Sequence, residues 1–313
     1  MKPTTIGFTL NYRDPVRTNR CIQSLLHDGV THVLVWDNSS DEGKNTKALQ
    51  ETWNAETCVS IIQSPENLGF AAGVNRGIEH ITSRFPEARL LLINNDAILL
   101  PGALTALNEA LDRTQQAVLA YPTIDNDSHL LETFYYHRFF GLITFRALPG
   151  SFPYASGCCL LIDLSRAPMP VFNENFFMYG EDTYLGWTLG RERIIHVRDA
   201  MIRHEGSASS GIGSRFYESR LVAGHWLLAR KLAKNRCDRI LLYGGRLMTL
   251  PLRALLRAWR YRSGVPIRSL WEGWRIARGH DPQRQKAQRY LQLPEAATCS
   301  NNASHLGTMR SGE

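Results

Sequence analysis

The stretch LLLINNDAILLPG (90–102) places two amides, Asn94 and Asn95, and one carboxylate, Asp96, directly after four branched aliphatic residues. A short apolar run bounded by polar residues is typical of a strand buried on both faces, as in a parallel sheet covered by helices. Asp96 would then lie just past the carboxyl end of the strand, where ligands bind in open α/β sheets. The helix expected from Pro101 begins too far away for Asp96 to cap it, so this carboxylate indicates a binding site.

Strand and helix patterns alternate on both sides of this stretch. We expect strands at 6–10, 32–36, 58–64 and 117–121, and helices at 17–27, 44–53, 69–81 and 101–112. Repeated βα units of this length predict an α/β fold with a doubly wound sheet and right-handed crossovers.

The second half of the chain is less regular. Residues 126–151 have the pattern of an aromatic, partly basic, irregular connection. The later patterns predict a strand in YASGCCLLIDL (154–164), a loop and helix in GEDTYLGWTLGR (180–191), a strand in RIIHVRDA (193–200) and a loop in HEGSASSGIGS (204–214). Beyond Arg215 the pattern is helical up to a polar tail after Gly279, which we expect to be partly disordered.

Length and composition exclude several classes of protein. The chain has 313 residues, 43% of them hydrophobic, which predicts a globular protein of about two domains and not a disordered one. The amino-terminal MKPTTIGFTLNYRDP resembles neither a secretory signal nor a membrane span, so we expect a cytoplasmic protein. The six cysteines contain no C-x-x-C pair, which favours reduced thiols over disulfides or a zinc site.

Positive charge is concentrated near the end of the chain, where nine arginines and one acid, Glu272, lie between residues 239 and 278. An amphipathic helix is expected here, with Pro251 in its first turn. One face is apolar and another is basic: Leu252, Leu255, Leu256 and Trp259 against Arg253, Arg257 and Arg260. Either the helix docks on its own domain with the arginines in solvent, or the arginines attach it to an anionic membrane surface. Since no stacking platform or recognised motif accompanies them, no nucleic-acid partner is expected.

Several polar residues follow segments that should end at one edge of the sheet. Asp37 follows HVLVW, Asp96 follows LLLINN, Glu181 and Asp182 follow NENFFMYG, and His204 opens a loop. Taken singly, Asp37 could be a turn former, and an isolated histidine is usually an ordinary residue. Together they indicate a ligand for a hard cation, an imidazole ligand and a separate carboxylate pair.

These pieces occur in an order that resembles a known family. They are VLVWDNSSDEG (33–43), NLGFAAGVNRGI (67–78), LLINNDAIL (91–99), ASGCCLLID (155–163), FNENFFMYGEDTYLGW (172–187) and HEGSASS (204–210). Their order and spacing resemble the inverting glycosyltransferases of family 2, and most of all the bacterial rhamnosyltransferases that build lipopolysaccharide and other envelope polysaccharides.

The resemblance covers roughly residues 5–235 and implies the GT-A fold, a nucleotide-binding mixed sheet joined to an acceptor-binding half. It implies a GT-A domain over 1–235, with a nucleotide-sugar-binding half at 1–125 and an acceptor and catalytic half at 126–235. Basic amphipathic helices at 236–279 and the polar tail at 280–313 would follow as a helical extension.

The resemblance also implies a metal site. Asp96 matches the last acid of the family's aspartate-containing metal motif and would bind Mg²⁺ or Mn²⁺ on the diphosphate of a nucleotide sugar. His204 matches a later histidine and would be a second ligand. Asn94 and Asn95 would line the pocket through neutral hydrogen bonds.

On the donor side, the resemblance gives Asp37 the role of accepting hydrogen bonds from the base or ribose, with Asn11 nearby. The glycine-rich segment would bring its backbone close to the nucleotide and sugar; its site residues are Asn67, Gly69, Phe70, Gly73 and Asn75. Its glycines are four residues apart, unlike those of the dinucleotide fingerprint. Gly69 and Gly73 could instead serve helix packing.

Glu181 and Asp182 resemble the family's E-D motif, whose carboxylate takes a proton from the acceptor hydroxyl. We expect Asp182 to be the base and Glu181 to orient it or touch the acceptor. Capping of the following helix by Asp182 is compatible with this role. Tyr184 and Trp187 depart from the acid and the basic residue that the family often has there, so the acceptor is less well defined than the reaction.

The expected function is therefore a metal-dependent, inverting transfer of L-rhamnose from dTDP-rhamnose to a lipopolysaccharide-core or other envelope glycolipid saccharide. The enzyme would be attached peripherally to the inner face of the cytoplasmic membrane. Two alternatives stay open: a UDP-linked donor of glucose, galactose or galactofuranose, or a non-catalytic nucleotide-sugar-binding subunit of a polysaccharide assembly. The joint presence of Asp96, Asp182 and His204 disfavours the second.

Overall fold

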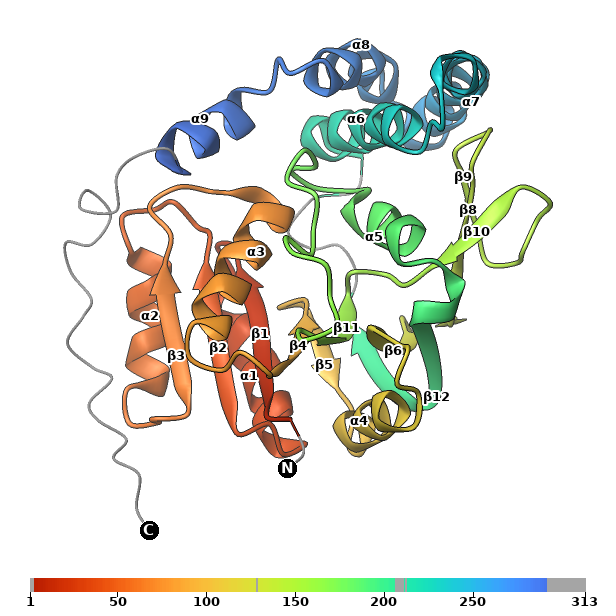
Figure 1. The fold of residues 1–313 in the computed structure, drawn as a ribbon. Coiled ribbons are helices and arrows are strands. Elements are labelled where there is room, and N and C mark those ends of the chain that lie inside the picture. The colour runs from red at the N-terminus through yellow and green to blue at the C-terminus, as the bar shows by residue number, and fades with distance from the viewer. Residues whose placement is uncertain (1–2, 128, 206–210, 212, 292–313) are drawn as a thin grey trace.

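The computed structural model describes residues 3–127, 129–205, 211 and 213–291. Within these residues, a nine-stranded mixed sheet forms the centre, in the order β3-β2-β1-β4-β11-β6-β12-β5, with β7 paired to β6 (Figure 1). The strands are β1 (Thr5–Asn11), β2 (His32–Asp37), β3 (Val59–Gln63), β4 (Arg89–Ile93), β5 (Ala97–Leu99), β6 (Leu119–Asp125), β7 (Leu130–Leu131), β11 (Cys159–Asp163) and β12 (Ile194–His204).

The sheet is parallel from β3 to β4 and then changes direction. β1 pairs in parallel with β2 and β4, and β2 with β3, whereas β11 runs antiparallel to β4 and β6. Cys159 of β11 therefore lies opposite Ile93 at the end of β4. The carboxyl ends of the parallel strands and the start of β11 share one edge, as the α/β prediction with a mixed sheet requires.

Helices cover both faces of this sheet. One face packs against α1 (Pro15–His27), α2 (Lys44–Trp53) and α4 (Ala103–Arg113), and the other against α3 (Gly69–Thr82) and α5 (Glu181–Leu189), which a short 3₁₀ turn, η1 (Arg191–Arg193), follows. All five residues of β4 are buried, with Leu91 and Ile93 in one core and Leu90 and Leu92 in the other. The prediction of a strand buried on both faces is confirmed.

The irregular connection expected at 126–151 is wrong in part, because the short strand β7 and a second, antiparallel sheet interrupt it. In this second sheet β8 (Phe134–His137) pairs with β9 (Leu142–Thr144) and β10 (Ser151–Tyr154). Its aromatic side chains pack into the core of the C-terminal helices, where Tyr136 is fully buried. These strands depend on tertiary packing, which the local pattern does not show.

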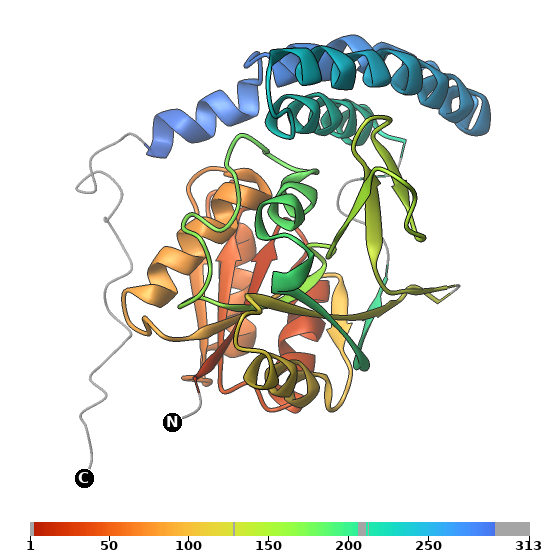
Figure 2. The same cartoon turned by 45° about the vertical axis from the view of Figure 1, so that its right-hand side comes forward.

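The C-terminal helices are α6 (Arg215–Lys231), α7 (Arg236–Tyr261), α8 (Val265–Ala277) and α9 (Pro282–Leu291). Figures 1 and 2 show α6, α7 and α8 stacked beyond the carboxyl-terminal edge of the parallel strands. α9 crosses to α3, where Ala287 packs against Leu68 and Ala72. The first part of the expected polar tail is thus a helix, while 292–313 and most of the loop expected at 204–214 lie outside the described residues.

The predicted start of the basic helix at Pro251 is wrong, since Pro251 lies inside α7. The helix starts where Asn235 caps it, with Asn235 Oδ1 accepting a hydrogen bond from the amide of Asp238 at 2.9 Å. A cap satisfies an amide that the first turn leaves free, whereas a proline is only tolerated there. In the described part of the chain, no helix is both long enough and apolar enough to cross a bilayer.

The helix α7 does pack on its own domain, but Arg253 and Arg257 lie neither in solvent nor on a surface that could meet a membrane. Arg257 forms a largely buried ion pair with Glu218 of α6, and Arg253 Nη1 lies 3.0 Å from His225 Nε2 of the same helix. The apolar side chains on the other face of α7, from Leu252 to Trp259, point to solvent. The basic face packs inward because α6 offers polar partners to it. Of the three arginines singled out from the sequence, Arg260 alone is exposed.

Candidate active site

Asp96 and His204 meet at the edge of the sheet. After β4 the chain turns through Asn94 and Asn95 into the short strand β5, which pairs antiparallel with β12 so that Ala97 faces His204. His204 Nε2 lies 3.2 Å from Asp96 Oδ1. The amide of Glu205 donates to the carbonyl of Asp96 at 3.0 Å and fixes this register.

The Asp96–His204 pair has the chemistry of a partial site for a divalent cation. Asp96 is buried, and its Oδ1 atom, apart from the ion-pair contact, has no hydrogen-bond partner among the described residues. The same residues contain no group of three or more His, Cys, Asp or Glu side chains placed to hold a metal. Mg²⁺ and similar ions often bind one or two protein side chains and complete their shell with substrate phosphates and water. The pair fits that arrangement.

The electrostatics of His204 depend on its neighbours. Burial acts to lower its pKa, but the Asp96 carboxylate and the Cys158 thiol outweigh burial and raise the pKa to about 10. His204 is therefore an imidazolium at neutral pH when it faces Asp96. A cation that takes both side chains as ligands has to displace this proton.

Asp37 lies where the sequence predicts, at the carboxyl end of β2, but protein groups occupy both of its oxygens. Oδ1 accepts from Asn11 Nδ2 at 2.9 Å and from the amide of Ser39 at 3.1 Å, and Oδ2 accepts from Thr46 Oγ1 at 2.6 Å. The bond from Ser39 is the turn that the alternative interpretation describes. Contact between Asp37 and a nucleotide stays a prediction.

A hydrogen-bond chain connects this group with the metal side of the edge. Asn95 Nδ2 donates to Thr18 Oγ1 at 3.0 Å, and Thr18 Oγ1 donates to Asn11 Oδ1 at 2.8 Å. Asn11, Asp37 and Asn95 are thus brought together through a threonine of α1 to which no sequence pattern points. Asn94 follows β4 directly, and its amide donates to the carbonyl of Cys158 at 2.8 Å.

The glycine-rich segment is used for packing. Asn67 Oδ1 accepts from the amide of Gly69 at 2.9 Å. Gly69 has φ +78°, and a Cβ atom there would lie 2.4 Å from the carbonyl oxygen of Phe177. At Gly73 a Cβ atom would lie 3.0 Å from the side-chain amide of Asn38. The packing alternative therefore has direct support for both glycines.

The remaining residues predicted for the sugar-donor site, Phe70 and Asn75, contact the segment before α5. Phe70 makes an edge contact with Phe172, and its amide donates to the carbonyl of Phe177 at 2.7 Å. Asn75 Nδ2 donates to the carbonyl of Phe172 at 2.8 Å, and Asn75 is almost fully buried. α3 thus positions the segment that leads to the carboxylate pair.

Glu181 and Asp182 form the first turn of α5. Asp182 accepts hydrogen bonds from the amide of Gly157 at 3.2 Å and from that of Thr183 at 2.6 Å. Glu181 is buried too, and its Oε2 atom has no hydrogen-bond partner within the described part of the chain. Burial, together with the neighbouring Asp182 charge, raises the pKa of Glu181 to about 8.

The pKa values of the two carboxyl groups depend on different neighbours. Burial also raises the pKa of Asp182, but the amides of Gly157 and Thr183 oppose that effect. With its pKa at about 8, Glu181 keeps its proton at neutral pH, and Asp182 is the member of the pair whose negative charge two amides stabilise. A carboxylate held by two amides beside a neutral acid suits proton abstraction from a hydroxyl group.

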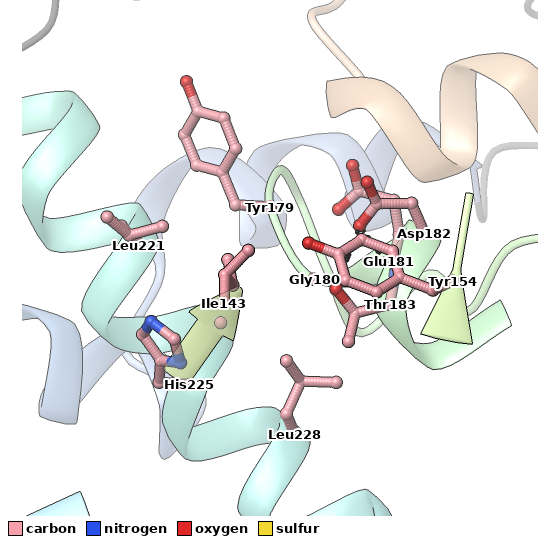
Figure 3. A pocket seen from close by; sticks show the side chains of 11 residues that line it. Ile143, Tyr154, Tyr179, Gly180, Glu181, Asp182, Thr183, Leu221, His225 and Leu228 are labelled. Carbon is pink, nitrogen blue, oxygen red and sulfur yellow. Dashed lines mark hydrogen bonds between the residues drawn. The ribbon is translucent and has the colours of Figure 1, made fainter. Parts of the chain in front are cut away.

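A pocket of about 120 Å³ opens beside this pair (Figure 3). Tyr154 and Tyr179 line it on the side of α5, and Leu221, His225 and Leu228 of α6 line the opposite side. None of these five residues was predicted from the sequence to belong to the site, although Tyr179 lies in the motif that precedes Glu181. The three from α6 look like ordinary helix positions in the sequence, and only the packing of α6 over α5 brings them to the pocket.

Residues 157 and 158 lie between the two groups of polar side chains. Gly157 donates to Asp182, while the Cys158 thiol neighbours His204. The Asp96–His204 pair and the Glu181–Asp182 pair therefore lie on either side of the two residues that precede β11. Although both residues lie in the ASGCCLLID motif, neither Gly157 nor Cys158 was expected from the sequence to have a role of its own.

Comparison with known proteins concerns the family of the chain and its fold. The sequence model described as Glycosyl transferase family 2 matches residues 9–165. The chain is 28% identical over 235 residues to the N-acetylglucosaminyl-diphospho-decaprenol L-rhamnosyltransferase of Mycobacterium tuberculosis, in strains CDC 1551 / Oshkosh and ATCC 25618 / H37Rv. The match covers 64% of this chain and 74% of that relative.

A solved structure of GalNAc-T7 with UDP, GalNAc and Mn²⁺ is similar with a TM-score of 0.56 at 10% sequence identity. The similarity covers 73% of this chain and 48% of that one, so this chain spans about half the length of GalNAc-T7 as solved. At this identity the likeness concerns the fold alone. It is the GT-A fold that the sequence predicts.

Proposed function

The chain belongs to glycosyl transferase family 2 and is a glycosyltransferase, and from that premise we propose that it moves L-rhamnose from dTDP-rhamnose onto a lipopolysaccharide-core or other envelope glycolipid saccharide. The donor and acceptor classes are suggested by its similarity to an N-acetylglucosaminyl-diphospho-decaprenol L-rhamnosyltransferase. The observation that supports the proposal is that the adjacent residues 157 and 158 contact both polar pairs, Gly157 through Asp182 and Cys158 through His204.

Asp182 is the proposed base. The acceptor hydroxyl loses its proton to Asp182 as its oxygen bonds to the anomeric carbon, and the bond from that carbon to the diphosphate breaks with its electron pair on the leaving oxygen. Attack from the opposite side inverts the anomeric configuration. The amides of Gly157 and Thr183 hold the carboxylate without neutralising it, and protonated Glu181 orients the acceptor with its unpartnered oxygen.

Asp96 and His204 are the proposed ligands of Mg²⁺ or Mn²⁺. The Asp96 Oδ1 atom without a hydrogen-bond partner and the neighbouring His204 imidazole are suitable ligands for such a cation. When bound, the cation stabilises the negative charge that develops on the diphosphate. Asn94 and Asn95 lie beside the pair and add no charge of their own. Asn11, Asp37 and the segment from Asn67 to Asn75 are the proposed walls of the donor site.

We also place the enzyme on the inner face of the cytoplasmic membrane, attached peripherally. A glycolipid keeps its lipid portion in the membrane while its saccharide extends into water. The pocket beside Asp182, lined by tyrosines and by α6, is the proposed acceptor site.

Thermal unfolding with a panel of nucleotide sugars tests the donor assignment. We expect dTDP-rhamnose with Mn²⁺ to raise the melting temperature more than UDP-glucose, UDP-galactose or UDP-galactofuranose, because a ligand at about 100 times its dissociation constant stabilises a fold by about 2.7 kcal/mol. Asp96→Asn should lose the metal-dependent part of this shift. If only a UDP-sugar raises the melting temperature, that sugar replaces dTDP-rhamnose as the proposed donor. If no donor raises it, the result favours the non-catalytic alternative.

The base assignment has its own variant. Asp182→Asn should keep the donor-induced shift and lower kcat by about a hundredfold or more, the usual contribution of a general base. Asp199→Asn, an exposed carboxylate on β12, is the matched control and should leave both quantities unchanged. Near-normal turnover of Asp182→Asn would refute the role of Asp182.

A further inference from the structure

One face of α7 is apolar and open to solvent along most of the helix. Leu247, Met248, Leu252, Leu255, Leu256 and Trp259 recur at spacings of three and four residues, and 57–83% of each residue's surface is exposed. We call these six side chains the α7 face. Soluble monomers rarely expose a contiguous apolar surface of this kind unless something docks on it.

The α7 face is held outward by polar contacts on the opposite side of the helix. Arg246 is completely buried and donates to the carbonyls of Arg138 and Phe139, and Arg257 pairs with Glu218. Rotating α7 to cover its leucines would break these contacts and leave buried charge without a partner. The contacts that hold α7 on the rest of the chain therefore fix the exposure of the α7 face. Figure 2 shows the helix along the outside of the molecule.

We propose that the α7 face docks on the surface of an anionic lipid bilayer, with α7 lying along the interface and its leucines among the acyl chains. This inference rests on the proposed glycolipid acceptor and identifies the surface by which the enzyme reaches it. Helices that lie in a membrane interface pair such an apolar face with basic residues at its borders.

The charges around the α7 face fit this partner. Arg239 lies before the face, and Arg260 and Arg262 follow it, all exposed. The acids of α7 and α8, Asp238 and Glu272, are paired with Arg138 and Arg215. The outward charge is therefore positive, which attracts anionic headgroups. A second copy of the chain would bring the same arginines against each other, which disfavours a dimer through this face.

The position of the acceptor pocket also fits. α7 holds the turn between β8 and β9, since Thr249 Oγ1 donates to the carbonyl of Phe140 at 2.8 Å. In the β9 region next to that turn, Leu142, Ile143 and Phe145 are exposed, and Ile143 also lines the pocket beside Asp182. Exposed apolar residues therefore lie both on α7 and on β9, whose turn α7 holds, and one of them lines the pocket. With α7 on the bilayer, this places the pocket on the membrane side of the enzyme for a lipid-linked saccharide.

Flotation of the full chain with vesicles tests the proposal. Phosphatidylglycerol with phosphatidylethanolamine should bind the protein, and phosphatidylcholine alone should bind it less. The triple variant Leu255→Gln, Leu256→Gln, Trp259→Gln should lower the partition coefficient at least about tenfold, because each large apolar side chain contributes to insertion. The matched triple Val16→Gln, Phe85→Gln, Leu130→Gln changes exposed apolar residues elsewhere and should bind like the wild type.

Docking of the α7 face on lipid would be overturned by unaltered vesicle binding of the α7 triple at an unchanged melting temperature. The proposal would also be overturned if the double variant Arg260→Gln, Arg262→Gln abolished vesicle binding while the α7 triple did not. If the wild type forms a dimer that the α7 triple does not form, and the wild type does not bind vesicles, then the α7 face binds a second copy of the chain. That result would overturn the proposal too. The α7 triple should still transfer sugar to a water-soluble acceptor. If the wild type binds vesicles but transfers no sugar, the proposed function is refuted while the docking surface is not.

Discussion

The protonation of Glu181 follows from where a single side chain is placed. It sits in the first turn of α5, buried beside the ionised Asp182, and these two effects raise its pKa from 4.5 to about 8. The cost of burying two negative charges side by side is avoided because only one of them forms at neutral pH. Glu181 thus holds its proton beside Asp182, the proposed base.

This arrangement predicts a dependence of stability on pH. Because the pKa of Glu181 is raised on folding, the folded state retains a proton that the unfolded state loses, so the free energy of unfolding falls as pH rises from about 4.5 to about 8. Glu181→Gln should flatten this slope. Urea denaturation at about pH 5 and about pH 8 measures it, with the exposed Glu51→Gln as control; equal slopes in all three proteins would contradict the assignment.

The sequence predicts where single site residues lie in the sheet, but it does not predict their hydrogen-bond partners. The edge of the sheet that carries Asn11, Asp37 and Asp96 follows from strand order, because parallel strands share their carboxyl ends. That Thr46 and Ser39 already occupy the Asp37 oxygens depends on the path of the loop after β2, which no local pattern encodes. The same is true of His225, which reaches the pocket from the last third of the chain.

At the scale of elements, helices and strands of the first 125 residues are predictable because their hydrophobic periods are local. The exception is β5, whose three residues are too few to show a period, although it sets the register that joins Asp96 to His204. The face of α7 that packs inward is not predictable in this way. A helical period separates an apolar face from a basic one, and partners such as Glu218 decide which of the two is buried.

The inward arginines make a prediction about α7. Arg257→Met leaves Glu218 buried without its partner and should lower the free energy of unfolding by about 3–5 kcal/mol. Arg260→Met, one turn away and exposed, should change it by less than about 0.5 kcal/mol. Denaturant unfolding of both variants measures this; similar small effects would mean that the Arg257–Glu218 pair does not hold α7 on α6.

Over the whole molecule, α9 connects the C-terminal helices to α3 and the glycine-rich segment. Asp281, just before α9, accepts from Arg220 of α6 at 2.8 Å, and both side chains are almost fully buried. The Arg220 guanidinium lies 4.4 Å from the ring centroid of Phe177, whose carbonyl holds Phe70 at the start of α3. Helices from the end of the sequence therefore support the glycine-rich segment from its first half.

A paired substitution measures this connection. Asp281→Asn removes the charge that faces buried Arg220 and should lower the free energy of unfolding by about 3 kcal/mol or more. Lys286→Met removes the exposed ion pair between α9 and Glu66 and should cost less than about 1 kcal/mol. Equal losses in the two variants would show that Arg220 and Asp281 contribute no more than a surface contact.

The inward packing of α7 has a consequence for how the enzyme can be separated from lipid. His225 and its helix α6 form one wall of the pocket beside Asp182, and Arg253 and Arg257 of α7 hold the other side of α6. Removing α7 to obtain a lipid-free enzyme would leave Glu218 and His225 without these partners and loosen the pocket. The proposed anchor and the active-site wall are one structural unit, so lipid affinity has to be tuned by changing the outer side chains of α7 while the helix stays in place.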